Sequence, residues 1–277
     1  MKYQILVDSA SDLSNDYLKN EKNIGFKVIP LTILANGKEF VDNDNINIDE
    51  MLENMHQCKS NSSACPAPQL FLDEFDKAEY TFIVTITAKL SGSYNSAVVA
   101  KNSAKKPDKI HVIDSKATSG TEILIVDKLV NLIKAGKEYN EIIEEIESFR
   151  DKRSLYFSLQ KFDNLVNTGR MSKIAGMVAK TLVIRPICIA LNGEIKVERK
   201  VIGIKNAFKK IIQMIKEKAG RDAPNQKLVI THCKAVVEAE QIKSDIEKEC
   251  NFKEIEILTM KGLCSYYALE KGIIICH

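Results

Sequence analysis

The chain of 277 residues contains no tryptophan, and only 6% of its residues are aromatic. It has no apolar run near the ~18 to 20 residues that a membrane-spanning helix needs, so we expect no integral membrane segment. Its N-terminus reaches an acidic residue, Asp8, too soon for a secretory signal peptide. The net charge is only +3, from 40 Lys+Arg and 37 Asp+Glu, which is too weak for a protein that binds nucleic acid through a basic stripe.

The chain also lacks the spacing of a metal or disulfide protein. It has seven cysteines, an odd number, and no two of them form a CxxC pair. This pattern argues against a disulfide framework and against a zinc ribbon. The four histidines show neither HxxxH nor HExxH spacing, so we expect no metal site. Unpaired, buried thiols are typical of a reducing cytosol, and we therefore expect a cytoplasmic protein.

The common catalytic signatures are missing as well. A GxSxG nucleophile elbow is absent, as are the GxGxxG fingerprint of dinucleotide binding and the GxxxxGK[ST] phosphate loop. Aspartates are frequent, but their spacing nominates no magnesium pair and no glycosidase pair. We predict no catalytic residue and no cofactor from these patterns.

What is present indicates an α/β protein of two domains. Apolar residues make up 45% of the chain and charged residues 28%, as in ordinary globular proteins. Up to about residue 152, apolar strands alternate with helices, including one expected to run through about Asn20, which predicts a mainly parallel sheet with flanking helices. After residue 152, the Asn192-Gly193 turn predicts a hairpin within an α+β domain with a mixed or antiparallel sheet. We expect domains at 1–152 and 153–277.

Three loops rich in small hydroxyl side chains follow predicted strands, at 8–12, 62–68 and 90–94. Ligands of open α/β sheets bind beyond the carboxyl ends of the strands. In the third loop, Ser91-Gly92-Ser93 opens a helix, where free amides and a hydroxyl favour a carboxylate or a phosphate. The alternative is that these serines only cap the helix, and that 62–68 is only a turn stiffened by proline.

Several segments together resemble the DegV family of bacterial fatty-acid-binding proteins, the lipid-carrying subunits of fatty acid kinase. The matching segments follow the order of the family's motifs and cover residues 3 to about 190. They are DSASDL at 8–13, IPL at 29–31, SACPAP at 63–68, LSGSYNSA at 90–97, VIDSK at 112–116, GRMSK at 169–173 and IRPI at 184–187.

The resemblance implies a long-chain fatty acid in a tunnel where two α/β domains meet. The hydroxyls that hold its carboxylate correspond to Ser63 and Ser91, supported by the amides around Gly92. Arg170 would dock the ATP-binding kinase subunit, which carries out phosphoryl transfer, so this chain would itself not be an enzyme. Family members often add a C-terminal His, but 259–267 contains none. We expect Ser265, or the charge of Lys261, to replace it.

Two other classes of function stay open at this point. The same loops suit an enzyme or binder of a small phosphorylated metabolite, which would have a polar pocket with a nearby acid, base or metal. An interaction protein would use Arg170 and its surroundings and would have no enclosed cavity. A lipid carrier predicts a long apolar cavity instead, since burying an acyl chain gives ~0.8 kcal/mol per CH₂.

Overall fold

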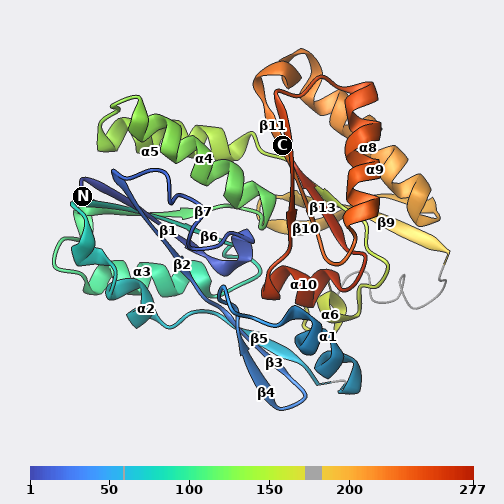
Figure 1. Ribbon diagram of the computed structural model, residues 1–277, viewed down its shortest axis with the longest axis horizontal. Helices are drawn as coiled ribbons and strands as arrows, with labels where there is room; N and C mark the ends of the chain where they lie inside the picture. The colour runs from blue at the N-terminus through green and yellow to red at the C-terminus, as the bar shows by residue number, and fades with distance from the viewer. Residues whose placement is uncertain (59, 172–182) are drawn as a thin grey trace.

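The computed structural model describes residues 1–58, 60–171 and 183–277, and Figure 1 shows two main sheets with helices packed around them. The first sheet has four strands that all pair in parallel. Their order across the sheet is β2 (Ile24–Ile29), β1 (Tyr3–Asp8), β6 (Tyr80–Thr85) and β7 (Ile110–Asp114). The predicted parallel sheet of the N-terminal half is therefore confirmed.

Both faces of this sheet are covered, which explains its nearly continuous apolar strands. In β1, Ile5 and Val7 point to one face and Leu6 to the other. The face of Ile5 packs against α4 (Gly120–Lys134) and α5 (Tyr139–Asp151). The face of Leu6 packs against α2 (Pro68–Leu72) and α3 (Ser93–Ser103), and Figure 1 shows the two helix pairs on opposite sides of the strands.

A small antiparallel sheet extends from the first one. Its strands are β4 (Lys38–Val41), β3 (Thr32–Ala35) and β5 (Ser62–Ala64), and α1 (Ile48–Gln57) lies between β4 and β5 in the chain. Asn36 and Gly37 turn the β3–β4 hairpin with φ of 51° and 75°, the left-handed conformation that an Asn-Gly turn adopts readily. Pairing with β3 makes β5 a strand, although its sequence alone indicated a loop.

The second sheet is mixed, as predicted for the C-terminal half. Its strands in order are β10 (Glu194–Ile202), β9 (Ile184–Leu191), β8 (Leu155–Phe157), β13 (Ile273–Cys276), β11 (Lys227–His232) and β12 (Glu254–Thr259). The pairing of β11 with β12 is parallel, whereas the other described pairings are antiparallel. Asn192 and Gly193 form the predicted hairpin turn, with φ of 53° and 83°.

The outer face of the second sheet packs against α8 (Ile204–Ala219) and α9 (Val236–Glu249). Its inner face turns Val229, Ile274 and Cys276 toward the core that contains α4. A Cβ added at Gly120 would lie 3.0 Å from the Cβ of Cys276, so glycine permits this close approach. Because one apolar core joins the two sheets, the domain boundary at 152/153 stays a prediction.

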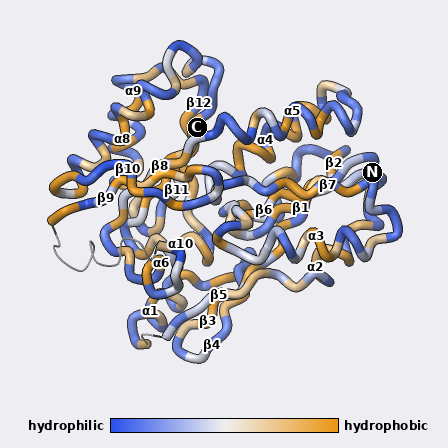
Figure 2. The backbone as a smooth tube through the Cα atoms, turned by 180° about the vertical axis from the view of Figure 1, so that it is seen from behind, coloured by the Kyte–Doolittle hydropathy of each residue, from blue (hydrophilic) through white to orange (hydrophobic). Residues whose placement is uncertain are grey.

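Hydropathy follows this layered arrangement. Figure 2 shows hydrophobic stretches along the strands in the middle of the molecule, while the helices alternate between hydrophobic and hydrophilic residues. That alternation is typical of helices with one buried face. In the described part of the chain, every helix is too short or too polar to cross a membrane.

The prediction of a helix that runs through about Asn20 is wrong. A short 3-10 helix, η1 (Ser9–Ser11), follows β1, and turns occupy the residues after it. The Asp8 carboxylate accepts a hydrogen bond from the amide of Ala10, and Asp12 takes a left-handed φ of 63°, which ends the helix. The sequence reasoning also missed α10 (Gly262–Ala268), and α6 (Asp163–Asn167) is a short helix that follows β8.

Candidate functional site

A cavity of about 350 Å³ lies between the two sheets, beyond the carboxyl ends of β6 and β7. This is the place where an open α/β sheet binds ligands, and the volume lies within the range of small-molecule sites. Most of its wall is aliphatic or aromatic. The apolar part includes Leu31, Ile86, Leu90, Leu155, Phe157, Leu159, Leu165, Ile195, Leu263 and Ile274.

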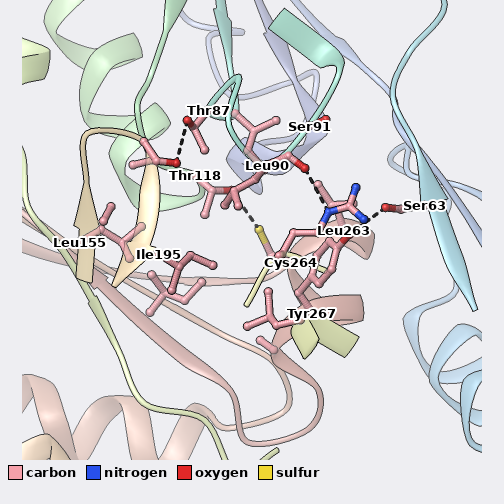
Figure 3. A pocket seen from close by; sticks show the side chains of 18 of the residues that line it. Ser63, Thr87, Leu90, Ser91, Thr118, Leu155, Ile195, Leu263, Cys264 and Tyr267 are labelled. Carbon is pink, nitrogen blue, oxygen red and sulfur yellow. Dashed lines mark hydrogen bonds between the residues drawn. The ribbon is translucent and has the colours of Figure 1, made fainter. Parts of the chain in front are cut away.

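Two serine hydroxyls lie at one end of the cavity. Thr87 and Thr118 line another part of its wall, and their hydroxyls donate to the carbonyls of Gly193 and Ala10. Ser63, Ser91 and Gly92 all line the cavity, so the structure brings three of the predicted site residues together. Figure 3 shows Ser63 and Ser91 at the end opposite Leu155 and Ile195. The site therefore has a polar end and an apolar body.

Ser63 comes from β5, whose pairing with β3 fixes its register opposite Ile33. Its Oγ lies 3.1 Å from the phenol oxygen of Tyr267 on α10, and either oxygen can donate the proton. Each hydroxyl carries one proton, and one hydrogen bond between them uses only one. One donor of the pair is therefore left for a ligand oxygen.

Ser91 contacts the start of α3 and also lines the cavity. Its Oγ accepts a hydrogen bond of 3.2 Å from the amide of Ser93, the first residue of α3, although Gly92 and not Ser91 occupies the N-cap position. Within the described residues, the Ser91 hydroxyl donates to no acceptor. A serine hydroxyl that accepts one hydrogen bond can still donate another, so this contact does not exclude ligand binding.

Gly92 meets a specific steric need. Its φ of −75° is open to any residue, so backbone conformation does not require glycine here. A Cβ at this position would lie 3.0 Å from the Sγ of Cys65, which also lines the cavity. The missing side chain lets the 62–68 loop close against the start of α3 at the polar end.

Arg170 also lines the cavity, as a half-buried residue. Its Nε donates to the carbonyl of Leu90 at 3.2 Å, and its Nη1 donates to the carbonyl of Thr168 at 2.9 Å. The guanidinium is thus tied to the loop that carries Ser91. The predicted docking role of Arg170 stays a prediction, and Ser172 and Lys173 of the same motif lie outside the described residues.

Ser265 does not lie where we expected it. It is fully buried, does not line the cavity, and donates to the carbonyl of Met260 at 3.3 Å. Lys261 pairs with Asp44 at 3.2 Å and does not line the cavity either. The reason is the direction of α10, which turns Leu263, Cys264, Tyr267 and Ala268 to the cavity and Ser265 away from it.

Tyr267 is the polar residue of this segment that sequence reasoning missed. It stands four positions after Leu263, which is the spacing of one helical face. That spacing was the available signal, but it required recognising a helix of seven residues. The adjacent Tyr266 is buried with its hydroxyl unpartnered among the described groups, so the two tyrosines differ in what they face.

Two buried carboxylates hold α10 in this orientation. Asp42 accepts hydrogen bonds from the amides of Gly262 at 2.6 Å and Leu263 at 2.9 Å. Asp12 accepts one from the amide of Lys261 at 2.7 Å. Burial raises the pKa of Asp42 to about 6 and that of Asp12 to about 7. Acceptors at a helix N-terminus satisfy amides that have no partner within the helix.

The charged side chains in the wall are few: Lys116, Arg170 and Glu194. Lys116 is already paired with Asp151 at 2.7 Å. Across 1–58, 60–171 and 183–277, no group of His, Cys, Asp or Glu gathers in a way that suits a metal ion. The arrangement fits a long apolar molecule with one polar end.

The chain is similar over nearly its whole length to known proteins. A family model described as an uncharacterised protein of the DegV family matches residues 2–276. A DegV domain-containing protein of Streptococcus pneumoniae strain R6 is 37% identical over 99% of this chain and 98% of its own length.

Two solved structures of relatives contain fatty acids. The fatty acid kinase B3 protein of Streptococcus pneumoniae, loaded with linoleic acid, is 35% identical, with a TM-score of 0.90 over 100% of this chain and 99% of that one. A DegV family protein of Eubacterium eligens, loaded with heptadecanoic acid, is 32% identical, with a TM-score of 0.89 over 99% and 98% of the two chains. The chain described here belongs to the DegV family.

Proposed function

We propose that this protein binds a long-chain fatty acid in the cavity between its two sheets. The carboxylate lies at the end formed by Ser63, Ser91 and Gly92, and the acyl chain runs toward Leu155 and Ile195. The observation that carries the proposal is the division of one cavity into a hydroxyl-lined end and an apolar body. The fatty acids in the two solved relatives support it.

The energetics suit such a ligand. Each methylene moved from water into an apolar cavity contributes ~0.8 kcal/mol, so a long chain supplies most of the affinity. A carboxylate buried without donors would cost much of that gain. The free hydroxyl of the Ser63–Tyr267 pair, the hydroxyl of Ser91 and the amides at the start of α3 provide donors.

The protein then presents the acid to a separate kinase subunit that binds ATP. That partner transfers the terminal phosphoryl group to the ligand carboxylate, so the present chain supplies binding and no catalytic residue. Arg170, at the edge of the polar end, is the candidate contact for the partner. The name of the fatty acid kinase B3 relative supports this role. A cytoplasmic location fits seven free thiols.

Native mass spectrometry of the purified protein tests the binding proposal. We expect a long-chain acid to co-purify, or to be taken up from solution at one molecule per chain. The Ser63→Ala/Ser91→Ala double variant should bind at least about tenfold more weakly, because two hydrogen bonds are lost. Ser265→Ala is the matched control, since that serine lies outside the cavity.

Two results would remove the proposal. The first is a protein that never takes up a long-chain acid. The second is displacement of a bound fluorescent fatty acid by small phosphorylated metabolites, with long-chain acids having no effect. That second result would favour the phosphate-binding alternative, which uses the same hydroxyls. Unchanged affinity in the double variant would instead move the carboxylate away from Ser63 and Ser91.

A further inference from the structure

Four carboxyl groups are buried in the interior, and two of them, Asp8 and Asp42, accept hydrogen bonds from the amides of the cavity-lining residues Ile86 and Leu263. The four groups belong to Asp8, Asp12, Asp42 and Glu122. The three aspartates each accept hydrogen bonds from amides or hydroxyls. Glu122 differs from them, because neither of its carboxyl oxygens has a hydrogen-bonding partner among the donors of the described residues, and its side chain is fully buried. This difference needs a physical explanation.

The surroundings of Glu122 are acidic. The start of α4 contacts the segment that carries Asp8 and Asp12, because the amide of Ser119 donates to the carbonyl of Ala10 at 2.8 Å. Asp8 and Asp12 are the charges that act on Glu122 most strongly. Glu122 lies in the first turn of α4, where the helix dipole favours an anion by less than about tenfold in an equilibrium. Burying a second bare carboxylate beside the first costs about a hundredfold or more. The dipole is therefore too weak to keep both acids ionised.

Protonation resolves the conflict. A protonated Glu122 has one O–H to donate, and the Asp8 carboxylate is the neighbouring acceptor whose charge acts on it most strongly. The proton belongs on Glu122 because Asp8 already accepts from the amides of Ala10 and Ile86 and from the hydroxyl of Ser93. Donors of this kind favour the ionised form of the residue that accepts them.

We propose that Glu122 is a neutral acid that donates a hydrogen bond to the Asp8 carboxylate and thereby positions the loop at 86–93 that forms the polar end of the cavity. Asp8 holds the first residue of this loop through the amide of Ile86, at 3.1 Å, and its last residue through the hydroxyl of Ser93. Ile86, Ser91 and Gly92 line the cavity. Glu122 is thus a positioning residue that does not touch the ligand.

The residues just before Glu122 contact the second sheet. Ser119, which precedes α4, donates to Asp12 and lies 2.7 Å from the Oγ1 of Thr231 in β11. Gly120 packs against β13. The start of α4 is therefore held by the second sheet, while Glu122 holds the Asp8 end of the first. The effect of Glu122 on ligand affinity rests on the proposed fatty acid binding. The hydrogen bond from a protonated Glu122 to Asp8 does not.

Titration sets the conditions for a test. Burial, and then the charge of Asp8, raises the pKa of Glu122 well above its ordinary value. Burial raises the pKa of Asp8 to about 6 and that of Asp12 to about 7. The thiol of Cys264 also faces this group, and burial raises its pKa too. At about pH 8 the aspartates are mostly ionised, and Glu122 is the group expected to keep its proton.

Infrared difference spectroscopy of the ligand-free protein at about pH 8 measures this proton directly. The wild-type spectrum minus that of Glu122→Gln should contain the C=O band of one protonated carboxyl group. The wild-type spectrum minus that of Asp12→Asn should lack it. A Glu122→Gln difference spectrum that shows only carboxylate bands would overturn the proposal.

Affinity for a fluorescent fatty acid tests the positioning role. Glu122→Gln keeps a donor for Asp8 and should bind within about twofold of the wild type, while Glu122→Met, of similar length, should bind at least about tenfold more weakly. Equal affinity of the two variants would refute positioning. If Glu122→Met does not fold, Glu122→Gln and its spectrum still decide the protonation. A wild type that binds no fatty acid would end the proposed function and leave the infrared result standing.

Discussion

The Oγ of Ser63 lies 3.1 Å from the phenol oxygen of Tyr267, across 204 positions of the chain. Ser63 belongs to the small antiparallel sheet, and Tyr267 to the helix that precedes β13. Their contact closes the polar end of the cavity with one residue from each half of the protein. A ligand carboxylate at this end would accept from whichever hydroxyl of the pair keeps a free proton.

Tyr267→Phe should weaken fatty acid binding about three- to tenfold, because it removes one hydroxyl from this pair and leaves the apolar ring in place. Isothermal titration calorimetry with a long-chain acid measures the change. Tyr266→Phe, on the same helix, is the matched control. The Tyr266 hydroxyl is buried without a partner among the described groups, so its loss should leave affinity unchanged. Equal effects of the two variants would show that the Ser63–Tyr267 pair does not contact the ligand.

Gly92→Ala should weaken binding about tenfold, because the new Cβ would lie 3.0 Å from the Sγ of Cys65 and push the 62–68 loop outward. Helix α3 itself should tolerate alanine at this φ of −75°. The same substitution in a Cys65→Ala background should have a smaller effect, since the contacting sulfur is gone. A double-mutant cycle of affinities measures this coupling. Additive effects would contradict the steric explanation.

Much of the fold could be predicted from local sequence. The Asn36-Gly37 and Asn192-Gly193 turns both form the hairpins that an Asn-Gly pair indicates. The apolar run at 80–85 is a central strand of a parallel sheet because both faces of that sheet are covered by helices. These features depend on neighbours in the sequence, so patterns of a few residues suffice to predict them.

The site required information that local patterns do not contain. Ser63, Ser91 and Gly92 were nominated as a group through the family resemblance, since nothing in their spacing says that β5 folds against α3. Ser265, in the segment 259–267, was also nominated through the resemblance, but it faces away from the cavity. The direction of α10 is set by Asp42, 220 positions from Gly262 in the chain. A contact of that range has no local signature.

Affinity should rise about fourfold with each methylene of a saturated acid, which corresponds to ~0.8 kcal/mol, until the chain fills the cavity. Ala190, opposite Ile195 in the β9–β10 hairpin, lines the apolar body. Ala190→Leu should therefore move the plateau to shorter acids, while an acid too short to reach Ala190 serves as the control. A series of affinities across chain lengths checks both statements. An unchanged plateau in the variant would place the chain elsewhere.

Cys65 should react with iodoacetamide in the free protein and be protected by a bound fatty acid. Its side chain is exposed and lines the polar end, whereas Cys264, in the same wall, is buried with a pKa raised well above its ordinary value. Peptide mass spectrometry follows the labelling. Cys58 lies outside the cavity wall and should label at the same rate with and without the acid. Equal protection of both cysteines would indicate a general change in the fold and not occupation of the cavity.

The stability of the fold should depend on pH through Asp12. Burial raises the pKa of Asp12 from 3.8 to about 7, so the folded state binds this proton more tightly than the unfolded state. The stabilisation is fully present below about pH 4 and is lost as the pH rises through about 7. Asp12→Asn stays neutral throughout this range. The free energy of unfolding of the wild type, minus that of the variant, should therefore fall by up to about 4 kcal/mol between these pH values.

Urea unfolding of both proteins at several pH values measures this difference, and a constant offset from altered hydrogen bonds does not change its slope. Asp76→Asn is the matched control, because Asp76 is exposed and forms only a surface pair with Lys105. Its difference from the wild type should stay within about 0.5 kcal/mol. A difference for Asp12→Asn that is flat, or that rises with pH, would mean that Asp12 is ionised in the folded state well below pH 7. The amide of Lys261 and the hydroxyl of Ser119 would then outweigh the cost of burying its charge.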